Sequence, residues 1–280
     1  MLSRLILILL PVLIGFSAIV QAAPKADLWP DWQAHDATND TVINHDRWQA
    51  VLDRHVVPQE DGATAFDYVA AKRQSRNEIA AYIDDMAAIA IGAYNRDEQM
   101  AYWINLYNAV TVLVVLDSYP VASIRDINIS PGLFASGPWG KKLVTVEGRS
   151  LSLDDIEHRI LRPIWRDARI HYAVNCASVG CPALAQKVFT GDDLDRQLDA
   201  AAVGFINHPR AVRLDEGGTA LILSRLYDWY RDDFGRSDRD LIAHLRTFAR
   251  PELHAILAQF EDGLKVNNYQ YDWALNDQPG

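Results

Sequence analysis

Residues 97–116 read DEQMAYWINLYNAVTVLVVL, and this stretch decides the fold because it predicts a helix that is apolar on nearly every side. Such a helix is stable only inside a protein, so we expect it to be the central helix of the core. At about 100° per residue, one side of this helix combines small and polar residues. These are Glu98, Ala101, Asn105, Asn108, Thr111 and Val112. Because buried amides need hydrogen-bond partners, Asn105 and Asn108 either tie loops to the helix or line a cleft.

Short β-like segments lie between and after the predicted helices. They are 143–146, 170–174, 211–214, 220–223 and a final segment around 269–273. The sequence DEGGT at 215–219 predicts that the third and fourth segments form a hairpin. Helix starts are predicted at Ser75, Asn95, Ser152, Thr190 and Ser237. Because the strands cluster late and do not alternate strictly with helices, the pattern favours an α+β fold. We expect a small, mostly antiparallel sheet packed by several helices around the buried central helix.

The N-terminus has the features of an export signal. Arg4 precedes an apolar run over residues 5–20, and Val20-Gln21-Ala22 places small residues where a signal peptidase cleaves. We therefore expect residues 1–22 to be a signal peptide, residues 23–44 a flexible segment, and residues 45–276 a single globular domain. This predicts a periplasmic or secreted protein with no stable membrane insertion after the signal is removed.

The charge balance excludes some classes of partner. The chain has 37 acidic and 27 basic residues, a formal net charge of −10. Such acidity argues against nucleic acid as a ligand, because nucleic-acid binding depends on positive charge. No nucleotide-binding glycine loop stands out, and no cofactor is predicted.

Residues 152–163 predict a short helix that Ser152 begins and Pro163 stops. Glu157 falls within its apolar face and His158 at the edge of that face. A buried carboxylate needs a cation or several donors. Glu157 is therefore either half of a buried ion pair or an acid or orienting group with a shifted pKa in a functional site.

The stretch HYAVNCASVGCP at 171–182 contains both cysteines of the chain. If residues 170–175 form a strand, His171 and Asn175 point to the same side, and Cys176 lies at the strand end, where functional side chains are common. Were the strand to continue through Cys176, that residue would face away from His171, and His158 would be the better candidate base.

Three interpretations of the cysteines remain open from the sequence. In an oxidising compartment, two cysteines five positions apart commonly form a disulfide, which here would join Cys176 and Cys181. Alternatively, Cys176 is a thiolate nucleophile that His171 or His158 activates and that Glu157 or Asn175 supports by orienting the histidine. The third is a metal site of His171, Cys176 and Cys181, whose spacing matches no standard zinc pattern.

Aromatic residues lie beside carboxylates in two further places. Trp139 follows a Ser-Gly-Pro turn, and residues 227–234 read YDWYRDDF. Such residues suit a surface that binds glycans or peptides. Equally, Tyr227, Tyr230 and Phe234 fall at i, i+3 and i+7, which is typical of a packed helical face.

Several ordered motifs together resemble the bacterial and plant family called domain of unknown function 547. The motifs are YWINLYNA at 102–109, LSLDDIEH at 151–158, the stretch 171–182, YDW at 227–229 with DF at 233–234, and YDWALN at 271–276. The resemblance covers roughly residues 45–276 and implies no established activity.

A looser likeness is to papain- and transglutaminase-type cysteine enzymes, in which a buried helix packs on a small sheet that presents a histidine. This chain carries Asn105 and Asn108 where that likeness would place the nucleophilic cysteine. This departure implies that any nucleophile comes from the Cys176 loop or that the protein uses another chemistry.

The leading hypothesis is a cysteine-dependent hydrolase or acyl/amide transferase acting on peptide, cell-wall or protein amide bonds of the envelope, with Cys176 as nucleophile. The rival is a non-catalytic binding module, in which a Cys176–Cys181 disulfide shapes a loop over a cleft lined by Asn105, Asn108, Cys181 and aromatic residues. A metal-assisted hydrolase centred on His171 is the third hypothesis.

Overall fold

The computed structural model of the chain describes residues 24–132, 136–260, 263 and 265–278. The predicted signal peptide, residues 1–22, lies outside the described residues.

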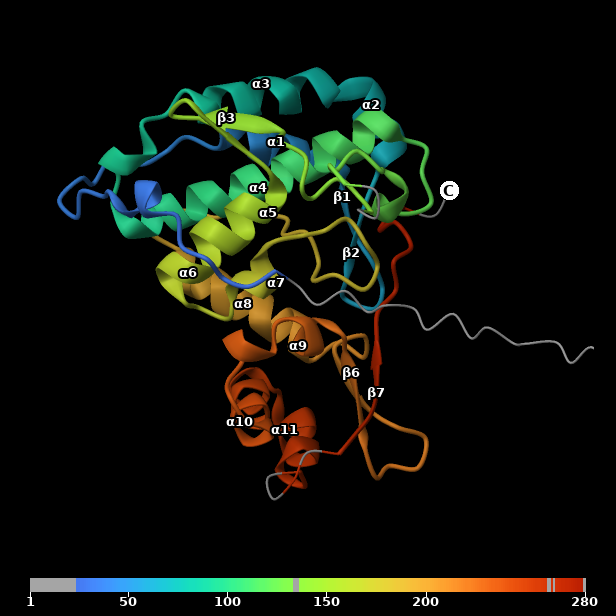
Figure 1. Cartoon of the computed structure of the whole chain (residues 1–280). Coiled ribbons are helices and arrows are strands. Elements are labelled where there is room, and N and C mark those ends of the chain that lie inside the picture. The colour runs from blue at the N-terminus through green and yellow to red at the C-terminus, as the bar shows by residue number, and fades with distance from the viewer. Residues whose placement is uncertain (1–23, 133–135, 261–262, 264, 279–280) are drawn as a thin grey trace, which may run out of the picture.

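The central helix, α4 (Arg96–Ser118), crosses the upper part of the molecule between α3 (Arg76–Ala87) on one side and the helix of residues 153–165 on the other (Figure 1). It begins where the Asn95 side chain accepts hydrogen bonds from the N–H groups of Asp97 and Glu98. This helix is long and apolar enough to cross a bilayer, but 94% of its most apolar window is buried inside the protein. The prediction of a buried central helix is confirmed.

The polar side of α4 binds the backbone of neighbouring loops. Glu98 accepts hydrogen bonds from the N–H groups of Ile43 (3.0 Å) and Gly191 (3.2 Å). Asn105 donates to the carbonyl of Phe189 (2.7 Å) and accepts from the N–H of the same residue (3.0 Å).

Asn108 forms the third such clamp. It donates to the carbonyl of Ala173 (3.0 Å) and accepts from the N–H of Asn175 (2.8 Å). The prediction that Asn105 and Asn108 tie loops to the helix is confirmed, and their side-chain amides are occupied by these bonds rather than facing a cleft.

The strands form three small sheets within the described residues. Two are antiparallel pairs, β1 (Val56–Pro58) with β2 (Thr64–Phe66) and β3 (Val144–Val146) with β4 (Arg149–Leu151). The third has the order β5 (Val212–Leu214), β6 (Leu221–Ser224), β7 (Val266–Gln270). β5 and β6 form the predicted antiparallel hairpin, whereas β7 joins β6 in parallel. The α+β prediction is confirmed, with the strands divided among three small, mostly antiparallel sheets.

The strand predicted at 170–174 is wrong, because these residues form the short helix α7 (Ile170–Ala173). In helical geometry Ile170 and Ala173 share the side that packs with α4, while Tyr172 joins a second hydrophobic cluster. The side chain of His171 therefore points in a third direction. The period of an apolar run of four or five residues does not distinguish a strand from a helix. Here the contacts that these residues make on several sides favour the helix.

The helix that Ser152 begins does not stop at Pro163. Ser152 forms a capping box with Asp155, and the chain continues through α5 (Leu153–Asp155), the π-helix η4 (Ile156–Leu161) and α6 (Arg162–Trp165). Pro163 cannot donate to a preceding carbonyl. The N–H groups of Asp27 and Trp29 instead donate to the carbonyls of residues 158 and 159, at 2.9 and 3.1 Å. Within the segment predicted to be flexible, 23–44, residues 27 and 29 thus bond to this helix, while Asp36 and Ile43 bond to Tyr94 and Glu98.

The remaining helices surround this core. They are η1 (Pro30–Gln33), α1 (Asp46–His55), α2 (Tyr68–Gln74), η2 (Ile91–Ala93), η3 (Ile124–Asp126), α8 (Leu194–Ile206), α9 (Leu226–Trp229), η5 (Arg231–Asp233), α10 (Asp238–Phe248) and α11 (Pro251–Ala258). A capping box begins α10 at Ser237 as predicted, whereas α8 begins after Asp193 rather than at Thr190. Ser75 precedes α3 but bonds His55 (2.8 Å) in place of the expected cap.

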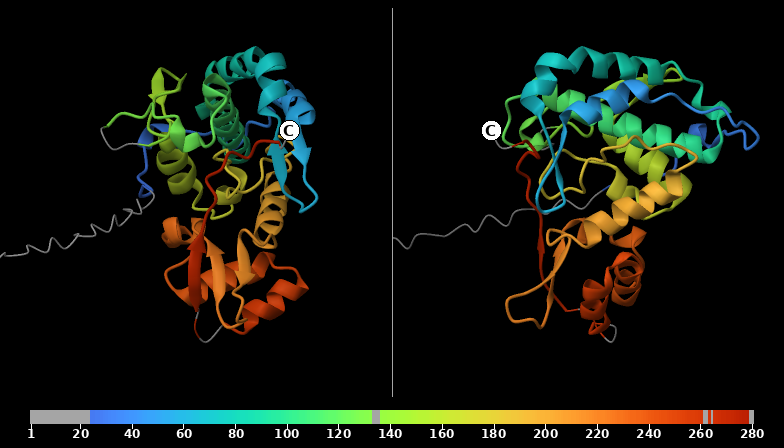
Figure 2. Two further views of the ribbon diagram at one scale, coloured as in Figure 1. Left: turned by 90° about the vertical axis from the view of Figure 1, so that its right-hand side faces the viewer. Right: turned by 180° about the vertical axis from the view of Figure 1, so that it is seen from behind.

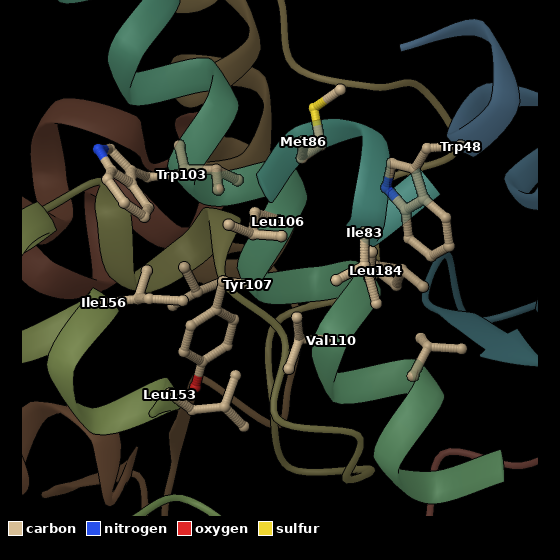
Figure 3. Close-up of a cluster of buried hydrophobic side chains, with 14 of the residues drawn as sticks. Trp48, Ile83, Met86, Trp103, Leu106, Tyr107, Val110, Leu153, Ile156 and Leu184 are labelled. Carbon is tan, nitrogen blue, oxygen red and sulfur yellow. The ribbon is translucent and has the colours of Figure 1, made fainter. Parts of the chain in front are cut away.

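The buried apolar side chains form two clusters. The larger surrounds α4, where side chains of α3, α4 and the Ser152 helix meet (Figure 3). The smaller lies in the lower part of the molecule between α8, α10 and the β5–β7 sheet. After β7 the chain rises from this lower part and ends beside β1 and β2 (Figure 2). α7 lies between the two clusters and contributes side chains to both.

We expect Asn108→Ala to destabilise the protein by roughly 2–5 kcal/mol, because it leaves one buried carbonyl and one buried N–H without a partner. Urea unfolding measures the change. The matched control is Asn77→Ala on the exposed side of α3, which should alter the free energy of unfolding by less than about 0.5 kcal/mol. Equal, small effects of both substitutions would contradict the clamp.

Candidate functional site

A group of buried charged side chains lies at the boundary of the two hydrophobic clusters. Glu157 and His158 come from η4, Arg162 from α6, His171 from α7 and Asp233 from η5. Four of the five are almost fully buried, and Asp233 is partly exposed. Burial of so many ionisable groups is stable only if they satisfy one another.

Asp233 neutralises one side of this group. Its carboxylate accepts two hydrogen bonds from the guanidinium of Arg162, at 2.6 and 3.2 Å, and lies 2.7 Å from Nε2 of His171. Burial alone would raise the pKa of Asp233, but the hydrogen bonds from His171 and Arg162 outweigh it and hold the pKa well below its usual range. Asp233 is therefore an anion throughout the neutral range.

Glu157 lies deeper. Its Oε2 accepts from the hydroxyl of Tyr107 at 3.3 Å, and its Oε1 lies 3.6 Å from Nδ1 of His171. Burial would raise the pKa of Glu157, but His158, His171 and Arg162 together lower it. The sequence left open whether Glu157 forms a buried ion pair or belongs to a site, and the structure places it beside Tyr107, His158 and His171.

His158 is held neutral by its surroundings. Its Nδ1 accepts from Nη1 of Arg162 at 3.0 Å, and burial lowers the pKa of His158 to about 4. His171 differs, because its Nε2 faces Asp233 while its buried Nδ1 has no hydrogen-bond partner among the described residues.

Tyr230 covers the group from the side of the smaller cluster. Its ring stacks on His171 at 4.0 Å between centroids, and the Arg162 guanidinium lies over the same ring at 4.9 Å. Its hydroxyl hydrogen-bonds to Glu157. The packing role predicted for the 227–234 segment is confirmed for Tyr227 and Phe234, which are buried, whereas Tyr230 packs against the charged group.

The loop after α7 carries both cysteines, and buried amides fix its shape. The Asn175 side chain donates to the carbonyl of Pro182 (2.7 Å) and accepts from the N–H of Ala177 (2.8 Å). Ala177 has a φ of 57°, a left-handed conformation that costs a non-glycine residue about 1–2 kcal/mol. The strained residue directly follows Cys176, and such strain persists where surrounding contacts impose it.

The Cys176 thiol is partly exposed and makes three contacts. Its Sγ lies 2.8 Å from the hydroxyl of Tyr271, 3.3 Å from that of Ser178 and 2.9 Å from Sγ of Cys181. Both cysteines are free thiols. The disulfide predicted as one alternative is therefore absent from this structure, and the two sulfur atoms share a hydrogen bond instead.

The two thiols have different acidities. The hydrogen bond from Cys181 lowers the pKa of Cys176, burial opposes it, and the Ser178 and Tyr271 hydroxyls add to the lowering, so the net pKa is below the usual value. Burial raises the pKa of Cys181 well above its usual value. Cys176 is thus the thiol that ionises first, and Cys181 keeps its proton and can donate it to the Cys176 sulfur.

The structure brings only some of the predicted site residues together. Glu157, His158 and His171 form one group as expected. No hydrogen bond between described residues joins Cys176 to either histidine, and Asn175 orients the loop rather than a histidine. Cys181 lies against Cys176, in place of the predicted cleft.

Neither the cysteines nor the histidines build a metal site. Among the described residues, no group of three or more His, Cys, Asp or Glu side chains is arranged to hold a metal ion. His171 points to Asp233 and Glu157, away from the ligand set that was predicted with Cys176 and Cys181.

Aromatic rings gather next to the thiol. Tyr271, which contacts Cys176, packs on Trp229 (4.8 Å between centroids) and Trp273 (4.6 Å). Trp139 meets Trp273 at 5.8 Å, so the predicted aromatic surface includes residues from three distant segments. All four rings are partly exposed. Aromatic faces of this kind suit peptides or sugar rings.

Sequence reasoning missed Ser178 and Tyr271 as partners of the thiol. Tyr271 follows β7, and its position beside Cys176 depends on the parallel pairing of β7 with β6 and on the bridge between Ser178 and Leu275. The motif YDWALN at 271–276 was a signal that this segment matters, but nothing in its spacing indicated the cysteine loop as its neighbour.

Comparison with known proteins supports the family resemblance. Residues 91–206 match the model of the family described as "Protein of unknown function, DUF547". The matched segment contains α4, the Ser152 helix and the cysteine loop, whereas Asp233 and Tyr271 lie outside it. No curated protein and no solved structure matched the chain.

The buried, neutral His158 predicts a specific pH dependence. Its pKa is about 4 in the folded protein against 6.5 for the free side chain, so the unfolded state binds the proton first as the pH falls. Stability is then complete above about pH 6.5 and decreases toward about pH 4. In the wild type, His158 should lower the free energy of unfolding by about 2 kcal/mol between about pH 7 and about pH 4.5. His158→Asn, which keeps an acceptor for Arg162, should lack this part of the decrease.

Urea unfolding at a series of pH values measures this difference. The control is His35→Asn at an exposed position, which should leave the wild-type slope intact. A His158→Asn variant whose stability falls with pH as steeply as the wild type would show that this histidine is not the cause.

The Tyr271 contact predicts the reactivity of the thiol. In Tyr271→Phe one donor to the Cys176 sulfur is lost, so the pKa of Cys176 should rise and its alkylation by iodoacetamide near neutral pH should slow about fivefold. Rates are read by mass spectrometry of the Cys176 peptide. Tyr269→Phe, in β7 and two residues before Tyr271, is the control and should react like the wild type; a Tyr271→Phe variant that does so too would refute the assignment.

Proposed function

We propose that this protein is an exported, Cys176-dependent hydrolase or acyl/amide transferase that acts on peptide or protein amide bonds of the cell envelope. The observation that carries the proposal is the environment of the Cys176 thiol, which is partly exposed, has a lowered pKa and receives hydrogen bonds from Cys181, Ser178 and Tyr271. The thiolate is the nucleophilic form of cysteine, so an environment rich in donors favours attack.

The chemistry requires two displacement steps. The Cys176 thiolate attacks the carbonyl carbon of the amide, the C–N bond breaks, and the amine leaves with a proton from water. Water or a second amine then attacks the thioester, which releases the acid or the new amide and restores the thiolate. Tyr271 and Ser178 lie where their hydroxyls meet the sulfur and can donate to it when it leaves.

The buried histidines support this site by positioning other residues rather than by transferring protons. Neither histidine contacts the sulfur. In this mechanism the thiolate therefore forms before the substrate binds, and no histidine accepts the thiol proton during the attack. Glu157 and His171 instead hold the ring of Tyr230 and the end of α7, directly before the cysteine loop. We assign His171, His158, Glu157 and Asn175 positioning roles, in place of the base and orienting roles that the sequence suggested.

The substrate class follows from the aromatic rings. Trp139, Trp229, Tyr271 and Trp273 form a partly exposed surface that adjoins the thiol. Such rings bind extended peptides and sugars well, and both occur together in cell-wall material. Residues 1–22 carry the export signal on which the envelope location depends.

One observation favours a second function, a non-catalytic binding module. Asp233, Glu157 or Arg162 engage both histidines, and no histidine or carboxylate of the described residues hydrogen-bonds to the thiol. In that case the aromatic surface would bind a peptide or glycan, and Cys176 would be dispensable for binding.

Activity of the purified protein on peptide and cell-wall amide substrates tests the proposal. Cys176→Ala should fold with an unchanged melting temperature yet lower kcat/KM by roughly 10³-fold or more. Cys181→Ala is the comparator: it removes a donor to the sulfur and should reduce the rate several-fold without abolishing it. Full turnover by Cys176→Ala would rule out the cysteine mechanism, and ligand binding without turnover by any form would favour the binding module.

A further inference from the structure

A pocket of about 620 Å³ lies on the β5–β7 sheet, beside the cysteine loop. Its lining includes Arg210, Arg213, Arg225, Tyr271, Asp272 and the backbone at Gly180. Figure 2 shows the β5–β7 sheet in the lower part of the molecule, with the chain rising from β7 toward the C-terminus.

The charge of this pocket is opposite to that of the protein. The chain has a formal net charge of −10, but the pocket contains three arginines and one aspartate. Arg225 lies 3.6 Å from Asp228. Arg210 and Arg213 form no ion pair with a carboxylate among the described residues, although Asp61 lies close enough to Arg210 to favour its charge.

Neutral acceptors orient the arginines without cancelling their charge. Nη1 of Arg210 donates to the carbonyl of Val179 (3.0 Å), Nη2 of Arg225 donates to the carbonyl of Tyr269 (3.3 Å), and Arg213 donates to the side chain of Gln270. The buried Nε of Arg210 has no partner among the described residues. A buried donor without a partner is costly, and a ligand acceptor would satisfy it.

The pocket is fixed in relation to the thiol. The N–H of Gly180 donates to the carbonyl of Asp272 at 2.8 Å, and a Cβ at Gly180 would lie 2.7 Å from the nitrogen of Asp272. The cysteine loop is thus pressed against the end of β7. Tyr271 lines the pocket, and its hydroxyl lies 2.8 Å from Sγ of Cys176.

We propose that this pocket binds a carboxylate of the substrate, so that the protein acts on acidic peptides whose amide carbonyl then reaches Cys176. The inference rests on the proposed function for its reaction and on the arginines for its ligand. Arginine forms paired hydrogen bonds with carboxylates and phosphates alike. Asp272 in the lining reduces the positive charge, which favours a singly charged carboxylate over a doubly charged phosphate.

Binding to the Cys176→Ala protein, which cannot turn substrate over, tests the inference by calorimetry or NMR. The probes are three acetylated tripeptides: Ala-Glu-Ala amide with a side-chain carboxylate, Ala-Gln-Ala with a free terminal carboxylate, and Ala-Gln-Ala amide with neither. We expect one of the acids to bind at least tenfold more tightly than the neutral peptide, and which acid binds identifies the source of the carboxylate.

Arg213→Ala and Arg225→Ala should each weaken that binding at least fivefold, whereas the matched control Arg239→Ala, exposed on α10, should not change it. Equal binding of acids and neutral peptide, wild-type binding by Arg213→Ala, or tighter binding of inorganic phosphate than of the acids would overturn the inference.

The same experiment separates this inference from the proposed function. Arginine-dependent binding of an acid together with no turnover by the wild type would support the pocket and contradict the enzyme. Turnover with no preference for acidic peptides would support the enzyme and contradict the pocket.

Discussion

The structure depends on the hydrogen bonds that buried polar side chains of α4 form with the backbone of other segments. An apolar helix can pack against apolar side chains alone, but it cannot satisfy the N–H and carbonyl groups of the irregular loops that cross it. Glu98, Asn105 and Asn108 do so with two bonds each, to residue 43, to the loop 189–191 and to residues 173–175. The sheets of the described residues have only two or three strands, so these three polar side chains replace much of the backbone pairing that a larger sheet would supply.

The candidate site depends on the hydrogen bonds of Asn108. Asn108 fixes the end of α7 and the start of the cysteine loop, Asn175 fixes the turn at Ala177, and the thiol between them meets the C-terminal segment at Tyr271. Beneath this turn, the charged group of η4, α7 and η5 occupies the boundary between two apolar clusters. Its charges compensate one another, so the boundary is held together by ion pairs and aromatic stacking on Tyr230 rather than by apolar packing.

The sequence carried the information for α4, for the loop-tying asparagines and for the burial of Glu157, because helical period and the cost of burying polar groups are local properties. It did not distinguish helix from strand at 170–174, where four residues pack on three different sides. The sequence also did not predict that Asp27 and Trp29 donate to the carbonyls of residues 158 and 159. Nor did it predict that Tyr271 contacts Cys176. Both contacts join segments more than 90 residues apart. The motif at 227–234 was assigned to packing, and the periodicity that supported this could not reveal that Tyr230 and Asp233 face buried histidines.

The most direct test of a reactive, free Cys176 is a count of thiols in protein isolated without added reductant from the periplasm, the compartment that the N-terminal sequence predicts. The alkylated cysteines are mapped by mass spectrometry in the native and in the denatured protein. The account predicts one labelled residue, Cys176, in the native protein and two after denaturation. Two blocked cysteines that become labelled only after reduction would contradict it, because the sulfur that is proposed to attack the substrate would then be held in a disulfide.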